Sequence, residues 1–278
     1  MCSTCGCSEG ARTAISNVEG SRTAANHEVP HPHEHQHDHL HPHEHDRGGG
    51  AHEHTHPHSE EAYRTIRLEQ DILAKNKRLA ERNRGWFEGR EIFAVNLMSA
   101  PGAGKTTLLE RTIRDLGGEL MISVIEGDQE TLRDAERIRT AGARAIQINT
   151  GTGCHLDADM LSRALRELDP PPRSVVMIEN VGNLVCPALF DLGEAARVVI
   201  MSVTEGEDKP LKYPHMFRAA DAMILSKADL LPHLEFDLER CVEYAHRVNP
   251  RLSVFELSAT RGTGLDSWYK WLRARGVS

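Results

Sequence analysis

The chain has 278 residues, of which 39% are hydrophobic, and a formal net charge of −8. This length allows one substantial α/β domain with appendages, or two small domains. The acidic charge argues against nucleic-acid binding, which needs a basic surface, and no apolar run approaches the roughly 18 residues of a membrane span. Since the Cys-rich N-terminus has no secretory pattern, we expect a cytoplasmic protein, without nucleic acid or membrane as partners, whose six cysteines stay reduced.

Residues 1–58 are predicted to form a disordered, metal-binding arm, because almost nothing in them can be buried to offset the entropy of ordering. The arm begins with Cys2, Cys5 and Cys7, and 13 of the 17 histidines lie between His27 and His58. Three thiolates and an α-amine suit the square-planar preference of Ni²⁺; a redox-labile tail with no specific metal is the alternative. The His-rich tract suits low-specificity buffering of several ions, or is simply a solvated polar tail.

Residues 59–90 are predicted to form an N-terminal helix, over about 59–83, and a linker. Acidic residues follow Ser59, the second half is basic, and Ile66, Ile72, Leu73 and Leu79 give a partial apolar stripe.

Residues 91–278 alternate predicted strands and helices, which indicates an α/β domain with a mostly parallel, doubly wound sheet. The predicted strands are Ile92–Met98, Leu120–Glu126, Arg144–Asn149, Ser174–Glu179, Ala196–Val203, Ala222–Ser226 and Leu252–Leu257.

A phosphate-binding P-loop is the strongest single signal, because Ser99-Ala100-Pro101-Gly102-Ala103-Gly104-Lys105-Thr106 lies between a predicted strand and a predicted helix. Gly102, Ala103 and Gly104 would bring backbone N–H groups to phosphate oxygens at the positive end of the helix dipole. Lys105 would bridge the β- and γ-phosphates, and Thr106 would give its hydroxyl to Mg²⁺. Thr107 completes the set. Ser99 replaces the usual first glycine; a plain turn is the alternative interpretation.

Ser226-Lys227-Ala228-Asp229 follows a later strand and predicts a guanine site. The Asp229 carboxylate would accept guanine N1–H and the 2-amino group, and Lys227 would pack over the base. Adenine offers neither donor, so such a site favours GTP over ATP. Ser258 and Ala259, after the next strand, resemble the loop that completes guanine sites. The alternative is a pair of solvated loops at strand ends.

Two acidic strand ends should face the phosphates, since open α/β sheets bind ligands at the carboxyl ends of their strands. We assign Asp128 to the Mg²⁺ shell or the attacking water, and Glu179 to the Mg²⁺ shell through a water; which does which stays open. With Lys105 they form the predicted catalytic set. No arginine finger stands out, so we expect slow intrinsic hydrolysis.

Cys154, His155 and Cys186 follow strands that end at the same edge of the sheet as the P-loop. Two thiolates and an imidazole suit Ni²⁺ or Zn²⁺, and three ligands leave room for a second protomer to complete the site. The alternative is two buried cysteines and an exposed histidine. Cys241 lies in an amphipathic pattern and is predicted to belong to the core.

The chain resembles the hydrogenase nickel-incorporation GTPases, the hydrogenase maturation factor B family, which are related to the urease accessory GTPase. The resemblance covers residue 59 to the C-terminus and the Cys-x-x-Cys-Gly-Cys start. It rests on the P-loop, Glu126-Gly127-Asp128, Cys154-His155, Glu179 to Pro187, Asp208 to Pro214 and Ser226 to Asp229.

This resemblance implies a P-loop GTPase of the SIMIBI type that binds GTP, Mg²⁺, Ni²⁺ and Zn²⁺. It also implies a homodimer promoted by GTP, with residues 209–217 in the dimer interface and a metal site at that interface. A small zinc-binding nickel-maturation partner and the hydrogenase large subunit precursor, as client, are the further partners that it implies. The leading hypothesis is that GTP hydrolysis changes the geometry of the metal site and releases nickel. The alternatives are a protein that mainly stores nickel, and a urease-type nickel-insertion GTPase, which the Cys186-Pro187 pair argues against.

Overall fold

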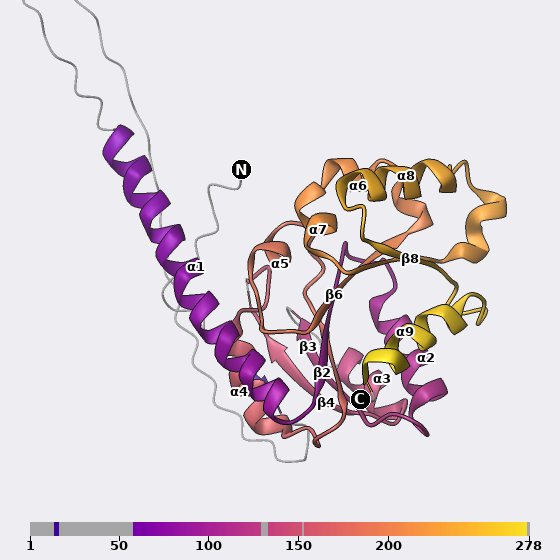
Figure 1. The fold of residues 1–278 in the computed structure, drawn as a ribbon, viewed down its shortest axis with the longest axis horizontal. Coiled ribbons are helices and arrows are strands. Elements are labelled where there is room, and N and C mark those ends of the chain that lie inside the picture. Colours follow the sequence, from indigo (N-terminus) through magenta and orange to yellow (C-terminus); the bar gives the residue numbers. More distant parts are fainter. Residues whose placement is uncertain (1–13, 17–57, 129–132, 152, 277–278) are drawn as a thin grey trace, which may run out of the picture. The chain divides into compact units, whose positions relative to one another are not determined.

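The computed structural model describes residues 14–16, 58–128, 133–151 and 153–276, and Figure 1 shows their fold. The strands are β1 (Ala14–Ser16), β2 (Phe93–Ser99), β3 (Ile122–Asp128), β4 (Arg144–Asn149), β5 (Val175–Glu179), β6 (Ala196–Ser202), β7 (Ala222–Ser226) and β8 (Ser253–Glu256). The α-helices are α1 (His58–Gly89), α2 (Lys105–Leu116), α3 (Arg133–Thr140), α4 (Ala158–Leu168), α5 (Cys186–Leu189), α6 (Lys209–Lys212), α7 (Pro214–Ala219), α8 (Leu238–Val248) and α9 (Leu265–Gly276), and η1 (Val203–Glu205) and η2 (Ala228–His233) are 3₁₀ turns. None of these helices is long and apolar enough to cross a membrane.

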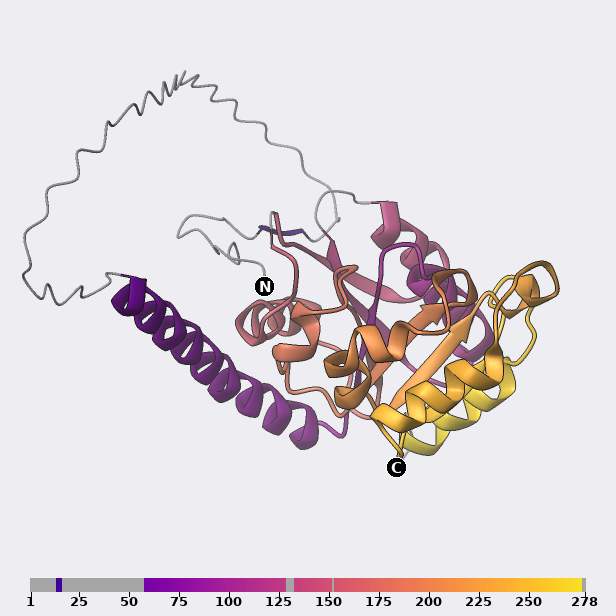
Figure 2. The ribbon, with the colours of Figure 1, turned by 90° about the horizontal axis from the view of Figure 1, so that it is seen from above.

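The sheet has the order β1-β4-β3-β5-β2-β6-β7-β8, and all of its strands except β1 run parallel. Figures 1 and 2 show helices on both of its faces. Both faces are covered because alternate side chains of a strand point to opposite faces. In β2, Val95 and Leu97 pack with α2 and α9, whereas Ala94 packs with α4 on the other face. Helices α7 and α8 cover the same side as α4, against β6 and β7. The predicted α/β fold with a doubly wound, mostly parallel sheet is confirmed, with strand ends shifted by at most two residues.

Helix α1 is longer than predicted and uses a different face. Over residues 70–89, where the structure describes its side chains, the buried ones are Asn76, Ala80, Asn83 and Phe87, whereas Ile72 and Leu73 are 43% and 38% exposed. The expected apolar stripe is therefore wrong at those two positions. From Gln70 on, α1 belongs to the same compact unit as the sheet, so the residues expected to form a separate helix and linker are partly built into the domain.

Within the predicted arm, the structure describes only β1 and His58, which begins α1. Strand β1 pairs antiparallel with β4, Ile15 opposite Ile148. The expectation of no regular structure is thus wrong for these three residues, because the edge of β4 offers backbone groups to any extended segment. The remaining residues of the arm lie outside the described part of the chain.

Candidate nucleotide site and metal centre

The P-loop forms the predicted turn between β2 and α2. Gly104 precedes α2 in a left-handed conformation, with φ of 97°, which glycine adopts without a steric cost. Lys105 is buried, and its Nζ donates to Ser99 Oγ at 2.8 Å. Ser99 thus supplies a polar partner for the lysine where most P-loops have glycine. Burial lowers the pKa of Lys105, and the nearby Glu179 carboxylate opposes that shift.

Thr106 and Glu179 meet beside Lys105. Thr106 Oγ1 donates to Glu179 Oε1 at 2.9 Å, while Glu179 Oε2 is buried without a hydrogen-bond partner in the described residues. Burial raises the pKa of Glu179 to about 7, although the charge of Lys105 and the bond from Thr106 act in the other direction. A hydroxyl next to a carboxylate with an unsatisfied buried oxygen is a donor set that fits Mg²⁺ and its waters.

A cavity of about 610 Å³ opens above these residues. Asp128 lines it as predicted. It is also lined by Glu126, Asp134 and Arg137, for which no role in the site is predicted from the sequence. Glu126 precedes Asp128 by two residues on the same strand, so the period of a strand places both side chains on one face. Burial, and then the neighbouring carboxylates, raise the pKa of Glu126 to about 9.

A second cavity of about 170 Å³ adjoins the first and gathers the residues predicted for the base. Its lining includes Ala103, Gly104, Thr107, Lys227, Asp229, Ser258 and Ala259. Lys227, which directly follows β7, donates from Nζ to Gly102 O at 2.8 Å. This bond connects the end of β7 to the P-loop. Asp229 Oδ1 is buried and has no hydrogen-bond partner among the described residues. This cavity therefore presents an unsatisfied acceptor, as a guanine site requires.

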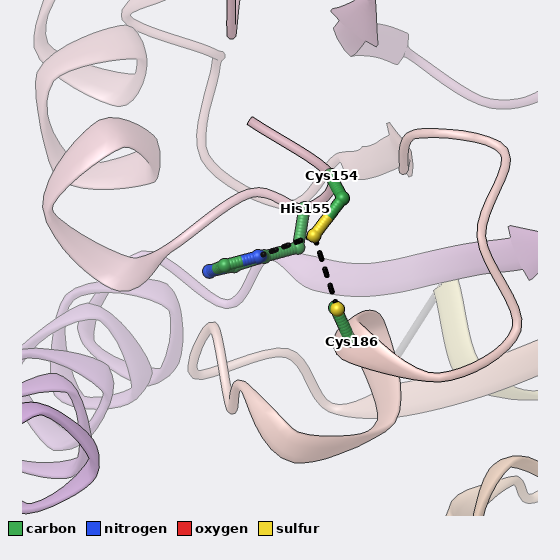
Figure 3. A group of neighbouring side chains, drawn as sticks. All are labelled: Cys154, His155 and Cys186. Atoms are coloured by element: carbon green, nitrogen blue, oxygen red, sulfur yellow. Dashed lines mark hydrogen bonds between the residues drawn. The ribbon is translucent and has the colours of Figure 1, made fainter. Parts of the chain in front are cut away.

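Cys154 and His155 follow β4 and Cys186 follows β5, whose ends lie at the same edge of the parallel sheet as the P-loop, and Figure 3 shows the three side chains converging. The two sulfur atoms lie 3.0 Å apart, and His155 Nδ1 lies 3.6 Å from Cys154 Sγ. One ligand atom from each residue fits within 4.8 Å of the others. The alternative of an exposed histidine is wrong, because His155 is only 8% exposed. Cys241 lies in the core, as predicted, and burial raises the pKa of its thiol to about 12.

Local contacts hold the three side chains in this arrangement. The His155 ring stacks on Phe190, with 3.8 Å between ring centroids, and burial lowers its pKa, which favours the neutral imidazole that binds metals. Asn183 Oδ1 accepts from the backbone N–H groups of Val185 and Cys186 and so fixes the turn into α5. The predicted ligands Cys2, Cys5 and Cys7 and the His-rich tract lie outside the described residues.

Comparisons with known proteins agree on one family. The sequence profile of the "CobW/HypB/UreG, nucleotide-binding domain" matches residues 93–256. Hydrogenase maturation factor HypB of Rhizobium leguminosarum bv. viciae is 62% identical over 209 residues, which are 75% of this chain and 70% of that protein. HypB of Escherichia coli (strain K12) is 55% identical over 212 residues, 76% and 73% of the two chains.

Solved structures are similar as well. The crystal structure of hydrogenase maturation factor HypB from Archaeoglobus fulgidus has a TM-score of 0.68 and 44% identity, and the match covers 72% of this chain and 98% of that one. The structure of HypB from Helicobacter pylori in complex with nickel also has a TM-score of 0.68, with 38% identity over 73% of this chain and 95% of that one.

Proposed function

Because the chain belongs to the CobW/HypB/UreG family, and within it to the hydrogenase maturation factors HypB, we propose that it is a GTP-hydrolysing metallochaperone that helps insert nickel into [NiFe]-hydrogenase. One observation supports this most. The cysteine–histidine centre and the phosphate cavity share one edge of the sheet, and the segment from Glu179 to Cys186 runs from one to the other.

The hydrolysis step uses the residues around the larger cavity. Water attacks the γ-phosphorus of GTP, the bond to the β–γ bridging oxygen breaks, and GDP and phosphate leave. Lys105 neutralises charge that builds up on the phosphate oxygens, and the P-loop backbone N–H groups hold them in place. Asp128 or Glu179 orients the attacking water. Asp229 selects guanine from the smaller cavity, assisted by Lys227.

Thr106 and Glu179 would hold Mg²⁺, as their donor set indicates. When bound, Mg²⁺ supplies positive charge to the phosphate oxygens. The hydroxyl–carboxylate contact shows that both side chains already point to one place. With Glu179 in that role, Asp128 would act on the water.

Nickel is the cargo of the second centre. Cys154, His155 and Cys186 give two thiolates and an imidazole, which also suit Zn²⁺. Three ligands from one chain leave coordination positions open, and we propose that a second copy closes the site in a GTP-promoted homodimer. The small zinc-binding maturation partner and the hydrogenase large subunit precursor would then donate and receive the metal.

The test is a nickel titration of the full chain, with and without a GTP analogue, while sedimentation follows dimerisation. We expect the analogue to promote the dimer and to change the nickel affinity of the centre. A Cys186→Ser variant is the matched control, because it keeps the arm and removes one ligand of the centre. Identical titrations of the wild-type chain in both conditions would contradict the proposal.

Nickel storage by the arm is a second candidate function, supported by its 13 histidines. Deleting residues 1–57 separates the two. Maturation of the client at ample nickel should survive the deletion if storage is an accessory role. Loss of maturation at ample nickel would make the arm the working part.

A further inference from the structure

Asn180 lies between the two centres. It follows Glu179 at the end of β5, is 1% exposed and lines the phosphate cavity. Its backbone N–H donates to Leu97 O at 3.0 Å, which extends the β2–β5 pairing by one residue. Its backbone is therefore fixed by the central strand, and its side chain projects from a rigid element.

The Asn180 amide uses both of its ends. Oδ1 accepts from the backbone N–H of Leu156 at 3.3 Å and from that of Val181 at 3.0 Å. Nδ2 donates to Asn96 Oδ1 at 3.2 Å. One oxygen thus joins the start of its own loop, at Val181, to a loop that lies 24 residues earlier in the sequence, at Leu156. A buried oxygen shared in this way costs free energy if either donor moves away.

The two loops carry different chemistry. Leu156 directly follows the ligands Cys154 and His155, so its N–H fixes the end of the metal-binding loop. Val181 leads to Gly182, where an added Cβ would lie only 3.1 Å from Pro101 Cα. The Val181 loop therefore packs directly on the P-loop, and a shift of one must displace the other.

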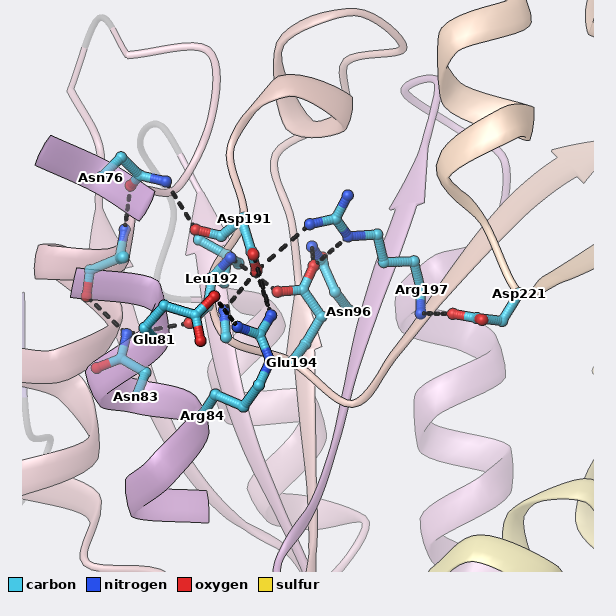
Figure 4. Close-up of polar contacts among 12 residues, drawn as sticks. Asn76, Glu81, Asn83, Arg84, Asn96, Asp191, Leu192, Glu194, Arg197 and Asp221 are labelled. Atoms are coloured by element: carbon cyan, nitrogen blue, oxygen red, sulfur yellow. Dashed lines mark hydrogen bonds and ion pairs between the residues drawn. The ribbon is translucent and has the colours of Figure 1, made fainter. Parts of the chain in front are cut away.

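A network of polar groups fixes the orientation of the Asn180 side-chain amide. Figure 4 shows the members of this network that lie beyond Asn180, which are Asn96, Glu194 and Leu192. Asn96 Nδ2 donates to Glu194 Oε1 at 3.1 Å, and Glu194 Oε2 accepts from Leu192 N at 2.7 Å. Because Asn96 Nδ2 is used in this way, Asn96 presents its oxygen to Asn180. The oxygen of Asn180 must then point to the two loops.

We propose that Asn180 is the positioning residue that couples the nucleotide site to the metal centre. The proposal rests on the function proposed above. A change at the phosphates moves the Val181 loop against the P-loop, and the shared oxygen passes the change to Leu156 and hence to the Cys154–His155 pair. Without that oxygen, each site binds its own ligand but the sites no longer affect each other.

The experiment measures the affinity of the full chain for a fluorescent, non-hydrolysable GTP analogue in excess Mg²⁺, with and without saturating Ni²⁺. Coupling is reciprocal, so nickel at the centre must change nucleotide affinity by the factor with which nucleotide changes nickel affinity. This readout is insensitive to nickel held elsewhere on the chain. We expect a change of about 5- to 150-fold in the wild-type chain, the usual range for coupled sites.

The variants separate the explanations. Cys186→Ser should show a ratio close to one, which assigns the wild-type effect to the centre. Asn180→Ala should also show a ratio close to one. Asn96→Ser removes the group that orients the Asn180 amide but changes neither loop, so its ratio should lie closer to one than that of the wild-type chain. This variant provides the test if Asn180→Ala does not fold. Asn249→Ala is the matched control: the Asn249 side-chain amide likewise donates to two backbone carbonyls, those of Phe217 and Ala220, and it contacts neither metal loop nor the P-loop, so the variant should keep the wild-type ratio.

Two results overturn the inference in distinguishable ways. A wild-type ratio of one means that the proposed coupling of hydrolysis to nickel release is wrong, and the role of Asn180 falls with it. A wild-type ratio far from one that survives in the Asn180 and Asn96 variants leaves the proposed function in place and removes Asn180 from it.

Discussion

Replacing Asp229 by Asn should change the base that the protein prefers. Asp229 Oδ1 is buried without a partner in the described chain, and guanine would supply two N–H donors to the carboxylate. Hydrogen bonds to a charged group contribute about 1.5–3 kcal/mol each. In the variant the amide oxygen still accepts from N1–H, but as a neutral group, and the amide N–H faces the 2-amino group, so one bond is lost and the other is weakened. Together these changes cost about 2–4 kcal/mol, or roughly 30- to 10³-fold in GTP affinity at 1.4 kcal/mol for each factor of ten.

The same change should favour xanthosine triphosphate, which has a carbonyl where guanine has its 2-amino group. The side-chain amide of the Asp229→Asn variant would offer an acceptor to N1–H and a donor to that carbonyl. Equilibrium titration with fluorescent GTP and xanthosine triphosphate analogues measures both affinities. Asp159→Asn is the control, since it removes one carboxylate from an exposed ion pair with Arg163. GTP affinity within about threefold of wild type in Asp229→Asn would refute the assignment of the base site.

Three further substitutions test the other parts of the site and its support. Lys105→Ala should abolish nucleotide binding, because it removes the buried cation of the P-loop, and GTP turnover that persists would contradict the phosphate assignment. Cys186→Ala should weaken nickel and zinc binding at the centre, which competition with a chromophoric chelator measures; unchanged affinity rules out its ligand role. Asp191 forms ion pairs with Arg84 and Arg197. Burial alone would raise the pKa of Asp191, but the hydrogen bond from Gly193 N–H and the interactions with the two arginines outweigh burial, so the pKa of Asp191 is lowered. The stabilisation is therefore present above the unfolded pKa of about 3.8 and is lost as pH falls through the folded pKa. Asp191→Asn should destabilise the protein by about 1–3 kcal/mol in urea unfolding at pH 7 and progressively less as the pH falls below 3.8, and an effect that stays constant over this range would refute this account.

The parts of the site that could be predicted from the sequence are those formed by motifs with a fixed backbone conformation. The P-loop, Asp229 and the Cys154–His155 pair each follow a buried strand, and parallel strands bring such residues to one edge. Glu126 was identified in its motif but received no role. Its position is set by the period of β3, and its burial by the two strands, β4 and β5, that flank β3 in the sheet. The proposed role of Asn180 could not be predicted from the sequence for a different reason: it depends on a hydrogen bond with a backbone group 24 residues away, which leaves no pattern in the sequence.

Helix α1 shows the same limit in the fold. Periodicity finds a helix by its apolar residues, yet α1 docks through two asparagine amides as well as through Ala80 and Phe87. Asn76 and Asn83 bond to the backbone of Ala158 and of the segment Asp191–Leu192, and the absence of a side chain at Gly193 lets α1 approach that segment closely. These backbone groups begin α4 and follow Phe190, so they support the metal-binding loop on one side while Asn180 holds it on the other. Asparagine serves in both places because one amide can satisfy a donor and an acceptor of loops that have no strand or helix to pair with. The segments that carry Cys154, His155 and Cys186 are thus held in part by side-chain amides and not by regular structure alone, so their arrangement depends on residues far from them in the sequence.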